Sequence, residues 1–199
     1  MSEAETLPSI TTSRLILRML REDDAGAVFR IFSDPDVMRF WSSTPYENKA
    51  QAEDLIEQTR VGFEKREFFQ WGIANAEDDK IIGTCTLFAL DKQNLRSEIG
   101  FALGRSYWGK GYMHETLEAL FAFAFEPLGM HRIEADVDPR NERCLATLEK
   151  LGFQREGMMR ERWLVGGERQ DSVFLGLLHE DWLAAAPEPE EVASVPEAE

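Results

Sequence analysis

A strand, a glycine-rich turn and a helix follow one another without a break over residues 97–125, and this passage constrains the fold more than any other part of the chain. Residues 97–103 alternate in polarity or size, which predicts a strand. Glycines stand at 104, 109 and 111, and a helical pattern then runs to residue 125. The first N–H groups of a helix lack partners and carry partial positive charge, and glycine lets the backbone approach an anion closely. The passage therefore predicts a phosphate-binding turn.

The glycine pattern of this turn differs from two common nucleotide-binding motifs. The Gly-Lys-Ser/Thr ending of a P-loop is missing, and so is the third glycine of the dinucleotide fingerprint. A Gly-x-Gly pair is weak evidence alone. Here it follows a predicted strand and opens a predicted helix, which is the context that phosphate binding requires.

The predicted strand at 97–103 has two different faces. Its alternation places Ile99, Phe101 and Leu103 on one face, which is typical of a core. Glu98 lies on the other face with two of the smallest residues, Gly100 and Ala102, and small residues on a strand often mark the close approach of a ligand. Two interpretations stay open for Glu98: it faces a narrow cleft, or it is a solvated glutamate on an edge strand.

A second passage, residues 138–153, also contains candidate site residues. Asn141 is placed to cap a helix at 141–151, and this role alone explains an asparagine there. Cys144 has helical spacing to Leu148 and Leu151, so a small buried residue explains it as well as a chemical role. Gly152 is expected to terminate this helix.

The remaining patterns predict a mixed α/β domain. Strands are expected at 14–20, 68–75, 80–90, 132–138, 153–165 and 168–178, and helices at 21–32, 49–66 and 180–186. The Asp-Pro-Asp sequence at 34–36 is expected to end the helix at 21–32, and residues 37–46 are expected to be irregular. We predict one domain over residues 8–185 and a disordered acidic tail, rich in proline and glutamate, over 186–199.

The charge of the chain limits its partners. With 22 Lys and Arg against 37 Asp and Glu, the net charge is −15, which argues against a nucleic-acid surface. The acidic charge is compatible with a cationic substrate such as an amine, but solubility alone also explains it and is the favoured interpretation. An anionic ligand would need local cations, and Arg105, Lys110 and the amides of the turn could supply them.

Cysteine and histidine usage exclude a disulfide framework and indicate no metal site. Cys85 and Cys144 are too few for a framework of disulfides, and reduced thiols fit a cytoplasmic location. The three histidines have no metal-ligand spacing with the cysteines. No apolar run is long enough to span a membrane, and residues 1–5 are acidic, unlike a signal peptide.

Together, the two passages resemble the Gcn5-related N-acetyltransferase (GNAT) family, in particular its ribosomal-protein N-terminal acetyltransferase branch. The resemblance covers residues 12–182 and depends on the order of the segments at 12–18, 98–101, 107–112 and 131–153. It implies the GNAT fold: an α+β domain with a central, mixed, mostly antiparallel sheet of about seven twisted strands, splayed at the cofactor cleft, and helices on both faces.

The resemblance implies acetyl-CoA as cofactor and assigns roles by position. The turn and the start of the helix would bind the pyrophosphate, the end of the strand would pair with the pantetheine arm, and the cap of the second helix would contact that arm too. The cofactor-binding positions are Phe101, Ala102, Leu103, Trp108, Gly109, Lys110, Gly111, Tyr112, Met113, His114 and Asn141.

The chain departs from the family pattern at three positions. Trp108 stands where the general motif has Gln or Arg, as is usual in this branch, and Met113 replaces a small residue. Cys144 replaces a serine that is proposed to protonate departing CoA. Some relatives place a glutamate base at the position of Trp163, with Glu161 two residues earlier. The base is therefore expected to be Glu98 first and Glu161 second.

The resemblance implies direct attack of a neutral amine on the acetyl thioester. The acceptor is expected to be a protein N-terminal α-amine; a small amine such as a polyamine, an antibiotic or an amino-acid derivative, and a non-catalytic acyl-CoA sensor, are the alternatives. Residues 40–46, Trp71 and Trp163 either line the acceptor side or pack in the core. The sequence leaves open the acceptor, the role of the tail, and whether the protein is a homodimer.

Overall fold

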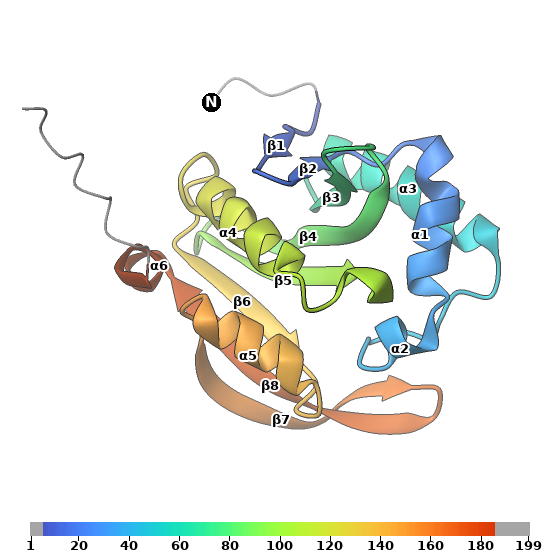
Figure 1. Ribbon diagram of the computed structural model, residues 1–199. Coiled ribbons are helices and arrows are strands. Elements are labelled where there is room, and N and C mark those ends of the chain that lie inside the picture. The colour runs from blue at the N-terminus through green and yellow to red at the C-terminus, as the bar shows by residue number, and fades with distance from the viewer. Residues whose placement is uncertain (1–5, 186–199) are drawn as a thin grey trace, which may run out of the picture.

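The computed structural model describes residues 6–185, and its centre is one eight-stranded sheet (Figure 1). The strand order is β1-β2-β3-β4-β5-β6-β8-β7, and every neighbouring pair is antiparallel except β5 and β6. The strands are β1 (Ile10–Thr11), β2 (Leu15–Arg18), β3 (Phe69–Asn75), β4 (Ile81–Asp91), β5 (Arg96–Leu103), β6 (Arg132–Val137), β7 (Gln154–Val165) and β8 (Glu168–Leu178). The mixed α/β fold expected from the sequence is confirmed, with β1 as an additional short strand. The predicted tail at 186–199 lies outside the described residues.

Helices cover both faces of this sheet (Figure 1). They are α1 (Ala25–Phe32), α2 (Pro35–Met38), α3 (Lys49–Glu64), α4 (Tyr112–Phe125), α5 (Glu142–Lys150) and α6 (His179–Ala185), with 3-10 turns η1 (Glu22–Asp24) and η2 (Arg105–Tyr107). In Figure 1, α4 and α5 lie over one face, while α1 and α3 lie over the other. Each face therefore requires its own hydrophobic core.

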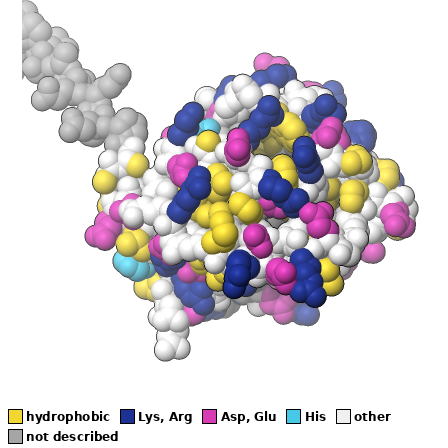
Figure 2. All heavy atoms as spheres, turned by 90° about the horizontal axis from the view of Figure 1, so that it is seen from below, with side chains coloured by type: hydrophobic (Ala, Val, Ile, Leu, Met, Phe, Trp, Pro, Cys, Tyr) yellow, Lys and Arg dark blue, Asp and Glu magenta, His cyan; other side chains and the backbone are white. Residues whose placement is uncertain are grey.

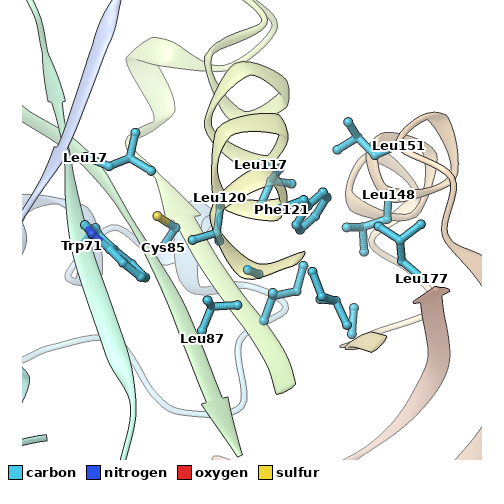
Figure 3. Close-up of a cluster of buried hydrophobic side chains, with 14 of the residues drawn as sticks. Leu17, Trp71, Cys85, Leu87, Leu117, Leu120, Phe121, Leu148, Leu151 and Leu177 are labelled. Carbon is cyan, nitrogen blue, oxygen red and sulfur yellow. The ribbon is translucent and has the colours of Figure 1, made fainter. Parts of the chain in front are cut away.

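The larger core lies between the sheet and helices α4 and α5 (Figure 3). Leu117, Leu120 and Phe121 of α4 point toward the sheet, where Trp71 and Leu87 are fully buried. Leu148 and Leu151 of α5 belong to the same core and lie next to Leu177 of β8. A smaller core joins α1, α3 and the opposite face of the sheet. Burying apolar surface on both sides fixes α4 and α5 beside the strands that carry the candidate site.

The strands β5 and β6 separate partway along their length, and this separation creates the site. Their parallel pairing joins Arg96 to Arg132 and ends where Glu98 pairs with Glu134. On its other edge, β5 stays paired with β4 as far as Leu103. Between Ile99 and Leu103, therefore, the backbone edge of β5 that faces β6 has no strand partner within residues 6–185.

The segment after α1 corrects one prediction. We expected the Asp-Pro-Asp sequence to end the helix before it, which it does, because α1 ends at Phe32. We also expected residues 37–46 to be irregular, which is wrong for Val37 and Met38. In the structure, Asp34 caps a new short helix, α2, by accepting a hydrogen bond from the Asp36 N–H at 2.9 Å. Pro35 occupies the first helical position, where its missing N–H is not needed. The predicted helix at 21–32 is also divided, into η1 and α1.

We expect Phe121→Ala to destabilise the protein strongly. The Phe121 side chain is fully buried, and its ring centroid lies 5.5 Å from that of Phe153. Loss of a buried phenyl ring lowers the free energy of unfolding by about 3–5 kcal/mol. Urea denaturation measures this loss. The control is Leu183→Ala, whose side chain is 56% exposed and which should change stability by no more than about 0.5 kcal/mol. Equal effects of the two substitutions would contradict the proposed core.

Candidate active site

A cleft of about 1710 Å³ opens where β5 and β6 separate. The start of α4, the start of α5, α2 and the far end of the β7–β8 hairpin also border it. The predicted site residues that line it are Glu98, Phe101, Ala102, Leu103, Trp108, Gly109, Gly111, Tyr112, Met113, His114, Asn141 and Cys144. Lys110 is the exception: it lies in the turn but not on the cleft wall, and its Nζ is 5.8 Å from the centre of the Tyr107 ring. The structure thus brings together two passages that are separated in sequence by most of α4 and by β6.

The glycine turn has a backbone shape that suits an anion. Gly109 and Gly111 have φ values of 72° and 79°, in the left-handed region that glycine adopts without strain. Gly111 caps α4, and the first helical hydrogen bond runs from the Glu115 N–H to the Gly111 carbonyl at 3.1 Å. The N–H groups of the residues between them have no partner within the helix. These groups and the helix dipole could hold a pyrophosphate, and this role stays a prediction.

A network centred on Glu115 holds this turn in place. The Glu115 carboxylate accepts hydrogen bonds from the Thr12 hydroxyl at 2.6 Å, the Ser13 hydroxyl at 3.0 Å, and the Arg14 N–H and Nε at 2.9 and 2.6 Å. Arg14 also donates to the Lys110 carbonyl at 3.0 Å. Partial burial opposes ionisation of Glu115, but the hydrogen bonds outweigh it and lower its pKa to about 2.

Glu115 was not among the residues predicted from the sequence. Its position in the first turn of a helix is a signal for a stabilising carboxylate, since negative charge is favoured there. Its partners, however, come from residues 12–14, and only the tertiary structure shows that they meet.

The backbone edge of β5 that faces β6 is open between Ile99 and Leu103. Its two faces are as predicted, because Ile99 and Leu103 belong to the α4-side core. Ala102 is buried in the α1-side core, so its side chain does not form an open wall. The Trp108 indole donates a hydrogen bond to the Leu103 carbonyl at 2.6 Å and so closes the end of the open edge. A narrow, extended group such as a pantetheine arm could pair with the remaining N–H and C=O groups.

Three carboxylates lie on one face of the sheet at the point where the strands separate. Glu98 and Glu134 are register partners, and Asp136 follows Glu134 by two residues on the same face. Glu134 accepts from Arg96 and Arg132, each at 2.8 Å, and Asp136 accepts from Arg162 at 2.5 Å. Glu98 has no ion pair or side-chain hydrogen bond among residues 6–185.

This environment keeps Glu98 partly protonated near neutral pH. Burial raises the pKa of Glu98, the nearby charge of Asp136 raises it further, and Arg162 lowers it, with a resulting pKa of about 7. A carboxyl group with a pKa near 7 is suited to general-base catalysis. Glu98 lines the cleft and is half-buried, so both its position and its chemistry fit a proton acceptor.

Glu161, the second candidate base, lies elsewhere. Its carboxylate pairs with Arg169 at 2.5 Å on the exposed part of the β7–β8 hairpin, and it does not line the cleft. Its neighbour Trp163 does. Of the two candidates, only Glu98 is placed in the cleft.

At the opposite wall, Asn141 and Cys144 are linked by the helix cap. The Asn141 side-chain oxygen accepts from the Cys144 N–H at 3.3 Å, so the predicted cap at α5 is confirmed. Burial raises the pKa of the Cys144 thiol to about 12. The thiol is therefore protonated at neutral pH, which suits a proton donor and disfavours a thiolate nucleophile.

The aromatic residues expected at the acceptor side divide between the cleft and the core. Phe40, Trp41 and Trp163 line the cleft. Trp71 is fully buried in the larger core, and Tyr46 stacks on Phe32 in the smaller one, with ring centroids 5.2 Å apart.

Figure 2 shows the face of the molecule that is seen from below in Figure 1. Lys and Arg side chains lie around hydrophobic groups there, with Asp and Glu between them, so the net acidity of the chain does not make this face uniformly negative. Among residues 6–185, no group of His, Cys, Asp and Glu could hold a metal ion, and no helix is long and apolar enough to cross a membrane.

Comparison with known proteins agrees with this geometry. Residues 14–154 match the family model of the acetyltransferase (GNAT) domain. The uncharacterized N-acetyltransferase p20 of Bacillus licheniformis is 34% identical over 88% of this chain and 99% of its own length. The [ribosomal protein uS5]-alanine N-acetyltransferase of Escherichia coli is 27% identical over 87% of this chain and 92% of its own.

A solved structure extends the similarity to the whole fold. The spermidine N-acetyltransferase of Vibrio cholerae, solved in complex with CoA and spermine, aligns with a TM-score of 0.76 at 22% identity, over 86% of this chain and 99% of that chain. The family resemblance that the sequence predicted is thus confirmed by the match of residues 14–154 and by the p20 relative. The chain belongs to the GNAT family of acetyl-CoA-dependent N-acetyltransferases.

Proposed function

We propose that the protein acetylates a protein N-terminal α-amine, with Glu98 as the general base. The observation that carries this proposal is the pKa of about 7 for Glu98. Unlike its neighbours Glu134 and Asp136, Glu98 forms no ion pair with an arginine among residues 6–185. An α-amine has a pKa of about 7.7–8.0, and a lysine-type amine about 10.4. At pH of about 7.4, freeing the amine costs roughly 0.5 kcal/mol in the first case and roughly 4 kcal/mol in the second. A weak base is sufficient for the α-amine.

The charges of the cleft are mixed and do not choose between a peptide and a polyamine. Asp36 pairs with Arg105, Asp136 with Arg162 and Asp138 with Arg140, whereas Glu98, Glu142 and Asp171 also line the cleft and have no ion pair among residues 6–185. Polyamine acetylation remains the second candidate, because the Vibrio cholerae relative in complex with spermine shares the fold. A polyamine would attack the thioester in the same way as an α-amine.

The residues of the cleft have separate roles in the proposed reaction. Bound acetyl-CoA supplies an activated acetyl group. The N–H groups of the glycine turn bind the pyrophosphate, and the open edge of β5 orients the pantetheine arm and polarises the carbonyl. Glu98 accepts the proton of the attacking amine, and the Cys144 thiol protonates the departing sulfur.

A thiol-release assay tests the acceptor class. Peptides with free N-termini are compared with the same peptides acetylated at the N-terminus, and with spermidine and spermine. We expect turnover only with free N-termini. Turnover only with polyamines would replace the proposed acceptor, and calorimetric binding of acetyl-CoA without turnover on any acceptor would indicate a sensor.

We expect Glu98→Gln to remove the acidic limb of the pH profile. In the wild type, kcat should rise as the pH passes through about 7, because Glu98 accepts a proton only when it is ionised. The variant should lose roughly 10²-fold or more in kcat above that pH. Acetyl-CoA affinity, measured by calorimetry, should not change. A variant that keeps the wild-type profile would remove Glu98 from this role.

Gly111→Ala should weaken cofactor binding. Alanine at a φ of 79° costs about 1–2 kcal/mol, and we expect the free turn to relieve this strain by leaving its binding conformation. Binding must then restore it, which corresponds to a roughly 5- to 30-fold higher Kd for acetyl-CoA. Its Cβ would also lie 3.4 Å from Arg14 Nη2. Gly157→Ala is the control, since a Cβ there meets nothing within 4 Å and the residue lies outside the cleft. An unchanged Kd for Gly111→Ala would argue against the turn as the pyrophosphate site.

Cys144 variants separate proton donation from covalent catalysis. Cys144→Ser keeps a proton donor and should retain most of kcat, whereas Cys144→Ala should lower kcat with little change in KM. Steady-state kinetics measures both. An acetyl group trapped on Cys144 during turnover would overturn the direct-attack mechanism.

A further inference from the structure

The strand β7 contains a bulge beside the cleft. Its register with β8 shifts between Met159 and Trp163, and Glu161 has a φ of 50°. The Glu161 N–H donates to the Asp171 carboxylate at 2.8 Å, which holds the bulge to β8. A non-glycine residue with positive φ next to a site points to a constrained backbone.

The bulge brings two consecutive side chains to one carboxylate. In a regular strand, neighbours such as Arg162 and Trp163 point to opposite faces. Here the Arg162 Nε and the Trp163 Nε1 both donate to Asp136, at 2.5 and 3.2 Å. The Ser172 hydroxyl donates to the same carboxylate from β8. The Asp136 side chain is 6% exposed, so its charge is buried and is balanced mainly by Arg162.

This cluster links three strands at the place where the proposed reaction occurs. Asp136 and Trp163 both line the cleft that contains Glu98. We propose that Asp136 and Arg162 are positioning residues for the reaction: Asp136 anchors the β7 bulge, and the bulge places Arg162 and Trp163 at the acceptor side, next to Glu98. This inference rests on the proposed function, since it assigns to the cluster the control of the proposed base.

The charges that face Glu98 come from three strands. Asp136 and Glu134 of β6 disfavour its ionised form, while Arg162 of β7 and Arg96 of its own strand favour it. Glu134 is already shared by two arginines, Arg96 and Arg132. The Asp136–Arg162 pair can therefore change this environment in two ways. Removing the negative charge of Asp136 favours ionised Glu98, and removing the positive charge of Arg162 disfavours it.

Two isosteric variants test the proposal. In Asp136→Asn, the ionisation midpoint of Glu98 should fall by about 0.5 pH unit or more, and in Arg162→Gln it should rise by about 0.5 unit or more. The midpoint is measured by carbon-13 NMR of the glutamate carboxyl groups, with Glu98→Gln to assign the signal. The acidic limb of the kcat profile should move in the same directions.

The matched control is Arg169→Gln. Arg169 lies on the same hairpin and pairs with Glu161 at 2.5 Å, but neither residue lines the cleft. The Arg169→Gln variant should leave the ionisation midpoint of Glu98 unchanged. Hydrogen exchange of residues 158–165 provides the second readout: Asp136→Asn should speed it at least tenfold, and Arg169→Gln should not.

Opposite shifts of the two variants with a silent control support the proposal. Shifts in the same direction, or none, overturn it, because a general loss of structure would not move the midpoint both ways. Unchanged hydrogen exchange in Asp136→Asn overturns the anchoring role. The NMR midpoint does not depend on catalysis. The two proposals can therefore fail separately. If the two variants shift the midpoint in opposite directions but Glu98→Gln keeps the wild-type kcat profile, Glu98 is not the base, while Asp136 and Arg162 still control its ionisation.

Discussion

The short parallel pairing between β5 and β6 is the constraint on which the site depends. It ends at Glu98 and Glu134, and beyond that point β5 is held only by β4. The larger core packs α4 and α5 against strands on both sides of the gap, and the smaller core holds α1 and α3 against the opposite face of the strands before it, so the positions of both strands are fixed. Parallel strands need a crossover, and here the crossover helix is α4. Because α4 begins at the glycine turn, its N-terminus is brought to the mouth of the gap.

The distribution of arginines decides which carboxylate is chemically available. Glu134 and Asp136 have side chains that are 11% and 6% exposed, and each has an arginine partner that stabilises its charge. Glu98 shares their face without such a partner in the described part of the chain, and burial then raises its pKa to about 7. The pKa of the proposed proton acceptor is thus set by its surroundings, since an isolated glutamate has a pKa of about 4.3.

Much of this arrangement was predictable from sequence because it is encoded locally. The strand that ends at Leu103, the positive-φ glycines 109 and 111, and the Asn141 cap are each signalled by residues close in sequence. The Arg96–Glu134 and Arg162–Asp136 ion pairs and the bulge at Glu161 were not predictable, because the residues involved meet across different strands. The helix end at Asp34-Pro35-Asp36 was predicted correctly, but the start of α2 at Pro35 was missed because a proline after an aspartate fits both a break and a first helical turn. The roles of Glu98 and Cys144 stay predictions.

The network around Glu115 has a consequence for how the protein folds. Its partners Thr12, Ser13 and Arg14 are 101 to 103 positions away in the sequence. The glycine turn and the start of α4 can form early, because they are local. The support from the first strands requires closing a long loop, and contacts of this kind form late. The turn that we propose to bind the pyrophosphate is therefore fully supported only when residues 12–14 have reached Glu115.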